Sequence, residues 1–377
     1  MRIGIDARAA VSIVDGIGRY VIELLAAFSR TSEDHEYIVL KHPSLHMSLG
    51  FDSRFKEFTL PFGRFGIQEQ LRLTRILEEH RLDLFHSLHF TLPLAYRGVQ
   101  VMTLHDIMPI VFPNFFGSTN LRSLLATQYF KIVVPISLRK ASMIIVDSEF
   151  TGSEIVKRFG VDRRKLRTVH LGLDHHKVTS GEKHDQRTSG RVPIPYVATI
   201  TNFRPYKNIP RLLTAFALAK KQIGNLHLAI VGHNPRYFRQ LLESCPEAKD
   251  ESVHFLGQVT DEEMNHILAS ASAFVFPSLY EGFGFPILEA MSAGTPVITS
   301  NAASLPEIGG DAAVYVDPTD PEQIANAIRS VCNDEKLAES LKSRGHRRIM
   351  EFTWDKTAKE TLLAYRAAIS MGREKTN

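Results

Sequence analysis

Two glutamates that bracket a glycine loop are the most informative residues of this chain. Seven residues separate Glu281 from Glu289, and they include Gly282, Gly284 and Pro286. Proline suits the first turn of a helix, so the pattern predicts a short helix that follows the loop and carries Glu289. The amide groups at the start of a helix favour an anion such as phosphate. Carboxylates on either side can hold hydroxyl groups, so the segment predicts a phosphorylated, polyhydroxylated ligand.

A second loop carries two cations. Arg204 and Lys207 lie between a predicted strand, Tyr196–Ile200, and a predicted helix that begins at Ile209. Arginine as a planar fork and lysine as a point charge together suit a diphosphate. The alternative is a solvated pair of surface cations. Because this loop and the glutamate loop should lie at the same edge of one sheet, the diphosphate interpretation is favoured.

Three residues of the first half follow predicted strands. His105 comes directly after Val101–Leu104, where a histidine can donate a hydrogen bond, exchange a proton or contact a sugar hydroxyl; a structural role is the alternative. Gly16 and Gly18 link the first strand to the first helix, and they permit close approach of a ligand or form an ordinary turn. They lack the spacing of a dinucleotide fingerprint, which argues against a nicotinamide dehydrogenase.

Other polar residues near strand ends have structural explanations. His86 and His89 have no acidic or cysteine partner at ligand spacing, so a metal site is disfavoured. Ser148 is expected to cap the helix that follows it.

Both halves alternate short β-rich runs with helical patterns, which is typical of parallel sheets covered by helices. The predicted strands are Ile3–Asp6, Tyr37–Leu40, Leu84–His86, Gln100–Leu104, Met143–Val146, Tyr196–Ile200, His227–Val231, Val253–Leu256, Ala273–Phe276, Val297–Thr299 and Ala313–Val316. The predicted helices are Tyr20–Ser29, Ile67–His80, Thr151–Phe159, Ile209–Lys221, Arg236–Leu242, Asp261–Ser270, Pro286–Ala293, Pro321–Cys332 and Trp354–Ser370. A polar, linker-like segment, 175–193, separates the halves. We therefore predict an α/β protein with two Rossmann-like domains facing across a cleft, 1–175 and 176–354, and a C-terminal helix, about 355–377, that crosses back to the first.

Composition indicates a soluble cytoplasmic protein. Apolar residues make up 44% of the 377 residues and charged residues 23%, and the two cysteines are isolated. Asp6 interrupts the place of a signal peptide, and no window reaches the length of a spanning helix. No nucleic-acid-binding module is recognisable.

One basic stretch stands out in the first half. No acidic residue occurs from Ile107 to Val146, where Arg122, Lys131, Arg139 and Lys140 punctuate an apolar sequence. Two interpretations stay open: a patch for anionic lipid headgroups, with peripheral association at the inner membrane, or a buried helix with a few solvated cations.

Together these residues resemble the retaining glycosyltransferases of family 4, which have the GT-B fold. The resemblance runs along most of the chain, and the Glu-x7-Glu element is its most specific mark. The motifs are GIGRY (16–20), FHSLHFTLPL (85–94), TLHDIMP (103–109), VDSEFTGSEIVKRFGV (146–161), HLGLD (170–174), FRPYKN (203–208) and SLYEGFGFPILEAMSAGTPVITSNAASLPEIGGDAAVYVDP (278–318). Within the family, the mannosyltransferases of bacterial surface-polysaccharide assembly are the most similar.

The resemblance implies roles for residues that bind the donor. Glu289 would hold the ribose hydroxyls, and Glu281 would contact the transferred sugar together with the backbone amides of Phe283 and Gly284. Arg204 and Lys207 would neutralise the departing diphosphate.

The resemblance also assigns residues of the first domain. Gly16 and Gly18 would let the N-terminal loop close over the diphosphate, and His105 would lie beside the donor sugar. No metal and no cofactor are expected, because the two cations replace a divalent ion at the leaving group. The first domain would hold the acceptor.

The sequence thus predicts a retaining hexosyltransferase that moves mannose from GDP-mannose to a glycan or lipid-linked acceptor in lipopolysaccharide or O-antigen synthesis. Alternatives are a UDP-sugar-dependent glucosyl- or N-acetylglucosaminyltransferase, an epimerase of the same fold, and a nucleotide-sugar-binding protein without catalysis.

Overall fold

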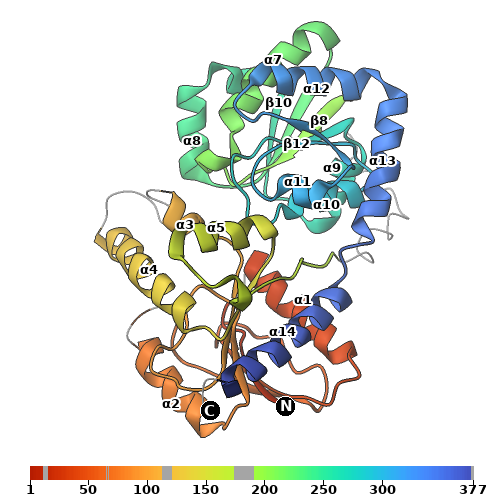
Figure 1. Ribbon diagram of the computed structural model, residues 1–377. Coiled ribbons are helices and arrows are strands. Elements are labelled where there is room, and N and C mark those ends of the chain that lie inside the picture. Colours follow the sequence, from red (N-terminus) through yellow and green to blue (C-terminus); the bar gives the residue numbers. More distant parts are fainter. Residues whose placement is uncertain (12–15, 65, 67, 113–120, 174–190, 375–377) are drawn as a thin grey trace. The chain divides into compact units, whose positions relative to one another are not determined.

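The computed structural model describes residues 1–11, 16–64, 66, 68–112, 121–173 and 191–374. Most of the predicted linker, 175–193, lies outside these residues. The chain divides into two compact units (Figure 1). Unit 1 comprises Met1–Gly172 and Thr353–Asn377, and unit 2 comprises Leu173–Phe352.

Unit 1 is built on a parallel sheet in which the described residues form seven strands. The strands are β1 (Arg2–Asp6), β2 (Glu36–Lys41), β3 (Phe55–Thr59), β4 (Leu84–Ser87), β5 (Gln100–Leu104), β6 (Met143–Val146) and β7 (Leu166–Thr168). Their order is β3-β2-β1-β4-β5-β6-β7, and each pair is parallel. The order reverses between β1 and β4, which makes this the topological switch point, where ligands bind in such sheets.

The helices of unit 1 cover this sheet. They are α1 (Gly16–Arg30), a π-helical turn η1 (Glu69–Leu73), α2 (Thr74–Glu79), α3 (Met108–Val111), α4 (Leu121–Lys140), α5 (Glu149–Phe159), the 3-10 turn η2 (Arg163–Lys165) and α14 (Trp354–Glu374). Helix α14 packs beside α1 (blue and red in Figure 1). Arg30 pairs with Asp355 at 2.7 Å, and the rings of Phe28 and Tyr365 lie 6.1 Å apart. The C-terminal segment is therefore part of the N-terminal unit.

Unit 2 has the same plan on a smaller sheet. Its described strands are β8 (Tyr196–Ile200), β9 (His227–Val231), β10 (Val253–Gly257), β11 (Ala273–Phe276), β12 (Val297–Ser300) and β13 (Ala313–Val316), in the order β10-β9-β8-β11-β12-β13. Its helices are η3 (Pro205–Lys207), α7 (Ile209–Ile223), α8 (Pro235–Ser244), η4 (Pro246–Lys249), α9 (Asp261–Ala269), α10 (Phe285–Ser292), α11 (Leu305–Gly309), α12 (Pro321–Asn333) and α13 (Glu335–Ile349). Here the switch point lies between β8 and β11.

The structure confirms each predicted strand to within a residue or two at its ends. It adds two strands that the sequence analysis did not predict, β3 and β7. Both lie at an edge of the sheet, and β3 exposes most of its side chains, so neither has the continuous apolar run of a central strand. None of the helices formed by the described residues combines the length and apolar character that crossing a bilayer requires.

Candidate functional site

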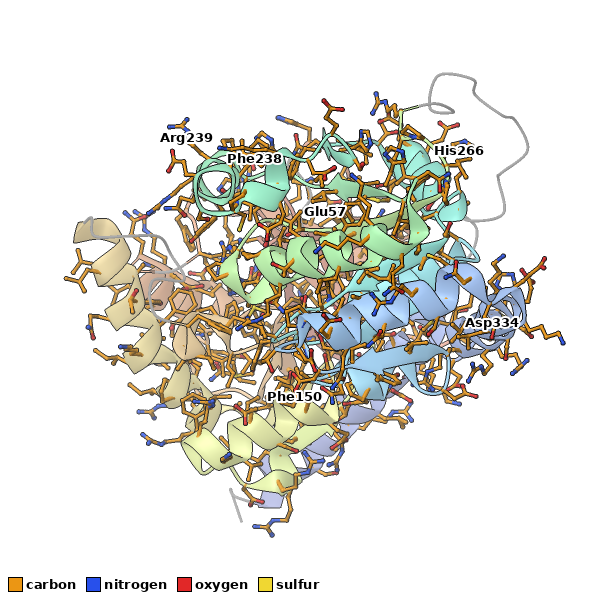
Figure 2. The ribbon with its side chains drawn as sticks, turned by 90° about the horizontal axis from the view of Figure 1, so that it is seen from above. Glu57, Phe150, Phe238, Arg239, His266 and Asp334 are labelled. Atoms are coloured by element: carbon orange, nitrogen blue, oxygen red, sulfur yellow. The ribbon has the colours of Figure 1, made fainter. Side chains whose placement is uncertain are left out.

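The loop after β8 is folded by its own side chains. The Thr201 hydroxyl accepts a hydrogen bond from the Phe203 amide at 2.8 Å, and the Asn202 side chain accepts one from the Arg204 amide at 3.2 Å. Phe203 has a φ of 58°, a left-handed conformation unusual for a bulky residue. Its ring packs 5.4 Å from that of Phe238, which Figure 2 labels on α8. This packing holds the strained turn in place.

Asn208 fastens this loop to the loop after β11. Its side-chain amide donates hydrogen bonds to the carbonyl groups of Pro277, at 3.0 Å, and Pro318, at 2.6 Å. The Leu279 amide donates to the Tyr206 carbonyl at 2.7 Å. Because the two loops follow strands on either side of the switch point, these contacts bring their side chains to one place.

Lys207 and Glu281 meet there. Lys207 Nζ lies 2.7 Å from Glu281 Oε1, and the two side chains are 12% and 9% exposed. The same ammonium lies 4.6 Å from the ring centroid of Phe276, so the ring face adds a cation–π contact. A solvated surface cation is therefore the wrong description of Lys207. A lysine ammonium has three N–H donors, and the contact with Oε1 uses one.

Ser304 shapes the glycine loop that carries Glu281. Its hydroxyl lies 3.0 Å from the Glu281 carbonyl and 2.8 Å from the Phe283 carbonyl, and it donates to them. Gly282, Phe283 and Gly284 are buried. Helix α10 begins at Phe285, directly after this loop, so the predicted order of loop and helix is confirmed.

Gly284 has a φ of 103°, and a Cβ built on it would lie 2.6 Å from Leu305 Cδ2, on a fully buried side chain. We expect Gly284→Ala to destabilise the fold by roughly 1–3 kcal/mol and to weaken donor binding. Gly294→Ala is the matched control, because Gly294 has a φ of 73° but open space around its Cβ position. Thermal unfolding of both variants measures the difference. Equal losses would show that the contact with Leu305 is irrelevant.

Arg204 and Glu289 belong to the same part of unit 2. Arg204 is half-buried and precedes the turn Pro205–Lys207, and Glu289 is half-buried in α10. The structure therefore brings Lys207 and Glu281 into direct contact. It places Arg204 on the same loop as Lys207, and Glu289 in the helix that follows the loop of Glu281.

In unit 1, His105 is held by a carboxylate that the sequence analysis did not single out. His105 Nδ1 lies 2.7 Å from Asp147 Oδ2, and both residues are buried. A carboxylate can only accept, so Nδ1 carries the proton and donates it. His105 follows β5 and Asp147 follows the adjacent β6. The signal available in the sequence was a polar residue directly after a strand, in the same motif as Ser148.

Aromatic and hydroxyl groups pack against this pair. The ring of Tyr20 lies 4.7 Å from that of His105, edge to face, and the Tyr20 hydroxyl lies 3.2 Å from Thr103 Oγ1. His86 Nε2 contacts the same Oγ1 at 2.8 Å, and its Nδ1 contacts the Tyr365 hydroxyl at 2.6 Å. Burial, and then the nearby His105, lowers the pKa of His86 to about 3. His86 is therefore a neutral residue of the core, hydrogen-bonded to Thr103 and Tyr365.

The predicted start of the first helix, at Tyr20, needs correction. Gly16 and Gly18 both lie in the first turn of α1, which begins at Gly16 rather than at Tyr20. The first amides of a helix have no partner within it, so glycine costs little there. The preceding residues, 12–15, lie outside the described part of the chain. Ser148, in contrast, caps α5 as predicted, because its hydroxyl accepts from the Thr151 amide at 3.1 Å.

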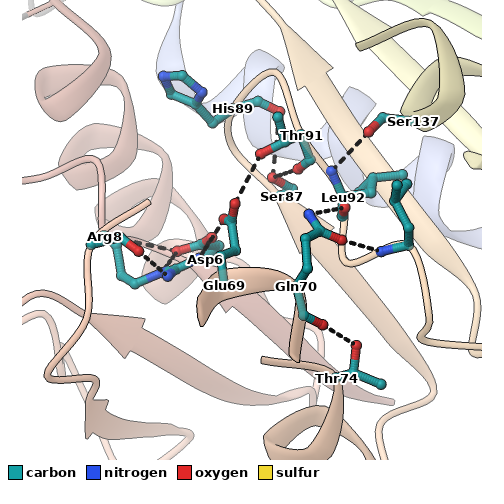
Figure 3. A network of polar contacts seen from close by, with 12 residues as sticks. Asp6, Arg8, Glu69, Gln70, Thr74, Ser87, His89, Thr91, Leu92 and Ser137 are labelled. Carbon is teal, nitrogen blue, oxygen red and sulfur yellow. Dashed lines mark hydrogen bonds and ion pairs between the residues drawn. The ribbon is translucent and has the colours of Figure 1, made fainter. Parts of the chain in front are cut away.

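A buried charge cluster lies at the switch point of unit 1 (Figure 3). Arg8 forms a two-pronged contact with Asp6, at 2.8 and 2.7 Å, and a further one with Glu69 at 2.9 Å. Burial opposes the charge of Arg8, but the two carboxylates outweigh it and raise its pKa. Ser87 Oγ donates to the Thr91 carbonyl at 2.7 Å. The cluster ties the segment after β1 to η1.

Two parallel-sheet α/β domains, each with a topological switch point, form the architecture of the GT-B fold. Residues 14–177 match the family model described as Glycosyltransferase Family 4, and residues 182–348 match that of Glycosyl transferases group 1. The chain belongs to glycosyltransferase family 4.

Curated relatives agree with this assignment. O-antigen chain mannosyltransferase B of Escherichia coli is 30% identical over 77% of this chain and 76% of its own length. O-antigen chain mannosyltransferase RfbU of Salmonella typhimurium is 25% identical over 85% of this chain and 82% of its own.

Solved structures show the same fold. Sucrose-phosphate synthase from Thermosynechococcus elongatus has a TM-score of 0.73 at 20% identity, covering 97% of this chain and 98% of its own. The Anabaena protein HepE, solved with UDP and glucose, has a TM-score of 0.70 at 20% identity, covering 96% and 99%.

Proposed function

We propose that this glycosyltransferase moves mannose from GDP-mannose to a glycan or lipid-linked saccharide, with retention of anomeric configuration and without a metal ion. The observation that carries the proposal is the buried contact between Lys207 and Glu281 at the switch point of unit 2. The names of the Escherichia coli and Salmonella typhimurium relatives support mannose as the sugar and O-antigen as the kind of product.

The chemistry follows from charge separation in the transition state. The bond between the anomeric carbon and the phosphate oxygen breaks, and a bond to the acceptor oxygen forms. The proton of the acceptor hydroxyl leaves on the diphosphate. Arg204 and Lys207 stabilise the negative charge that develops on this leaving group more than they stabilise the bound substrate. The amides at the start of α10 act in the same direction.

The remaining roles divide between the ends of the donor. In this proposal Glu289 holds the ribose hydroxyls, and Glu281 contacts the sugar together with the amides of Phe283 and Gly284. The proposal assigns His105 to the donor sugar, and Asp147 accepts the hydrogen bond from its Nδ1. The proposal also assigns Gly16 and Gly18, in the first turn of α1, to the diphosphate end of the donor. The enzyme works in the cytoplasm, where nucleotide sugars are available to it.

The donor is tested by calorimetry of the full chain with GDP-mannose, UDP-glucose and UDP-N-acetylglucosamine. We expect GDP-mannose to bind at least ten-fold more tightly than either UDP-sugar. Tighter binding of a UDP-sugar would assign the chain to the glucosyl- or N-acetylglucosaminyltransferases instead.

Transfer is then measured with mannose oligosaccharides in the presence of EDTA, and the anomeric configuration of the product is read by NMR. We expect an α-linked product and full activity without metal. An inverted product, or a requirement for added Mg²⁺ or Mn²⁺, would contradict those parts of the proposal. Binding without turnover across the acceptor panel would favour a sensor of nucleotide sugars.

A further inference from the structure

Helix α4 (yellow in Figure 1) exposes an unusual number of large apolar side chains. Leu124, Leu125, Ile132 and Ile136 are 57%, 59%, 59% and 40% exposed. They account for four of the eleven large apolar side chains that are exposed among the described residues. Leu125, Ile132 and Ile136 are spaced by seven and four residues, so they form one stripe along the helix.

The opposite face of α4 is fixed to unit 1. Phe130, Val134 and Leu138 are buried, and the ring of Phe130 lies 5.5 Å from that of Phe90. The Leu92 amide donates a hydrogen bond to Ser137 Oγ at 3.1 Å. Turning the exposed stripe inward would break these contacts, so the stripe belongs to the surface of the folded unit.

Cations accompany the stripe. Lys131 and Arg139 are exposed on the same helix, and no acidic residue occurs between positions 107 and 146. At the end of α4, Lys165 Nζ donates to the carbonyl groups of Arg139, at 2.8 Å, and Ala141, at 2.9 Å. Burial lowers the pKa of Lys140, and so does the charge of Arg97, which is a further cation near this helix. The apolar stripe is thus bordered by positive charge alone on its own helix.

We propose that this face of α4, which we call the α4 stripe, docks the protein onto a bilayer that contains anionic lipids. Apolar side chains on a surface helix enter the boundary between headgroups and acyl chains, while lysine and arginine reach the phosphate groups. Anionic headgroups attract these cations in addition. The helix lies on the membrane and does not span it. The proposal goes beyond the transfer reaction and depends neither on the donor nor on the acceptor.

The test is co-sedimentation of the full chain with vesicles of phosphatidylcholine alone or with one-third phosphatidylglycerol. We expect binding to the anionic vesicles and little to the neutral ones. A quadruple variant, Leu124→Gln, Leu125→Gln, Ile132→Gln and Ile136→Gln, should lose at least ten-fold in affinity. A charge variant, Lys131→Gln with Arg139→Gln, should lose about 25-fold at low salt, which is about five-fold for each cation.

The matched control is Met350→Gln with Leu363→Gln, which removes two apolar side chains of comparable exposure, 67% and 53%, outside α4. It should bind vesicles like the unmodified chain. Circular dichroism and donor calorimetry report whether each variant is folded, and donor affinity should stay unchanged in all of them. Failure of the chain to bind anionic vesicles, or undiminished binding by the folded quadruple variant, would overturn the proposal. So would a dimer that the quadruple variant converts to a monomer, because the stripe would then join two copies.

Discussion

Lys207→Ala is expected to lower turnover by roughly 10²–10³-fold, the loss typical of removing one preorganised group that stabilises developing negative charge. Steady-state kinetics with a saturating donor measures this effect. The structure adds a second consequence. Since Glu281 would remain buried without its cation, the variant should also lose about 3–5 kcal/mol in its free energy of unfolding. A drop in measured activity alone would therefore not distinguish a loss of catalysis from a loss of folded protein.

A double variant separates the two effects. Lys207→Met with Glu281→Gln removes both charges and keeps most of the packing, so the free energy of unfolding should recover most of the loss. Turnover should stay low, because the leaving group still lacks its cation. Lys220→Ala is the matched control. Lys220 pairs with Asp250 at 2.7 Å on an exposed surface of the same unit, and its removal should cost less than about 1 kcal/mol. Near-normal turnover of the folded Lys207→Ala variant would contradict the assignment of Lys207 to the diphosphate.

The sequence was sufficient for the core of the fold because the central strands are buried runs of mostly apolar residues. Gln100–Leu104 and Met143–Val146, for example, have the predicted bounds. Edge strands carry no such signal. In β3, Phe55–Thr59, the side chains of Lys56, Phe58 and Thr59 are exposed, and only pairing with β2 makes the segment a strand. Helix α13, Glu335–Ile349, was likewise not predicted. Its sequence is rich in charged residues, and the few residues of its buried face do not form a clear apolar pattern.

The candidate site was predictable only in part, for a related reason. Glu281 and Lys207 are 74 residues apart, and their types and glycine neighbours indicated a shared ligand. Their direct contact is a property of the strand order, in which β11 lies beside β8, and no local pattern encodes that neighbourhood. Asn208 and Ser304 were missed because a side chain that folds a loop looks, in sequence, like any polar loop residue.

The second large effect concerns Asp147, which the structure places 2.7 Å from His105 Nδ1. Asp147→Asn should lower turnover by roughly 10²-fold, the contribution typical of a positioned acid or base, while KM for the donor changes little. The physical reason is the proton on Nδ1. A carboxylate can only accept, so it fixes both the tautomer and the orientation of the ring, whereas an amide offers a donor as well. Nitrogen chemical shifts of the His105 ring should report a mixed tautomer.

A merely structural role for Asp147 would predict a different pattern. If Asp147 acts through His105, then Asp147→Asn should have no further effect on turnover in a His105→Ala background, and the double-mutant cycle will show strong coupling. Independent effects that add would contradict the positioning role. Asp162→Asn is the matched control, since Asp162 is an exposed carboxylate that pairs with Arg164 in the same unit. It should leave both turnover and the histidine shifts unchanged, so that any loss in Asp147→Asn belongs to the contact with His105.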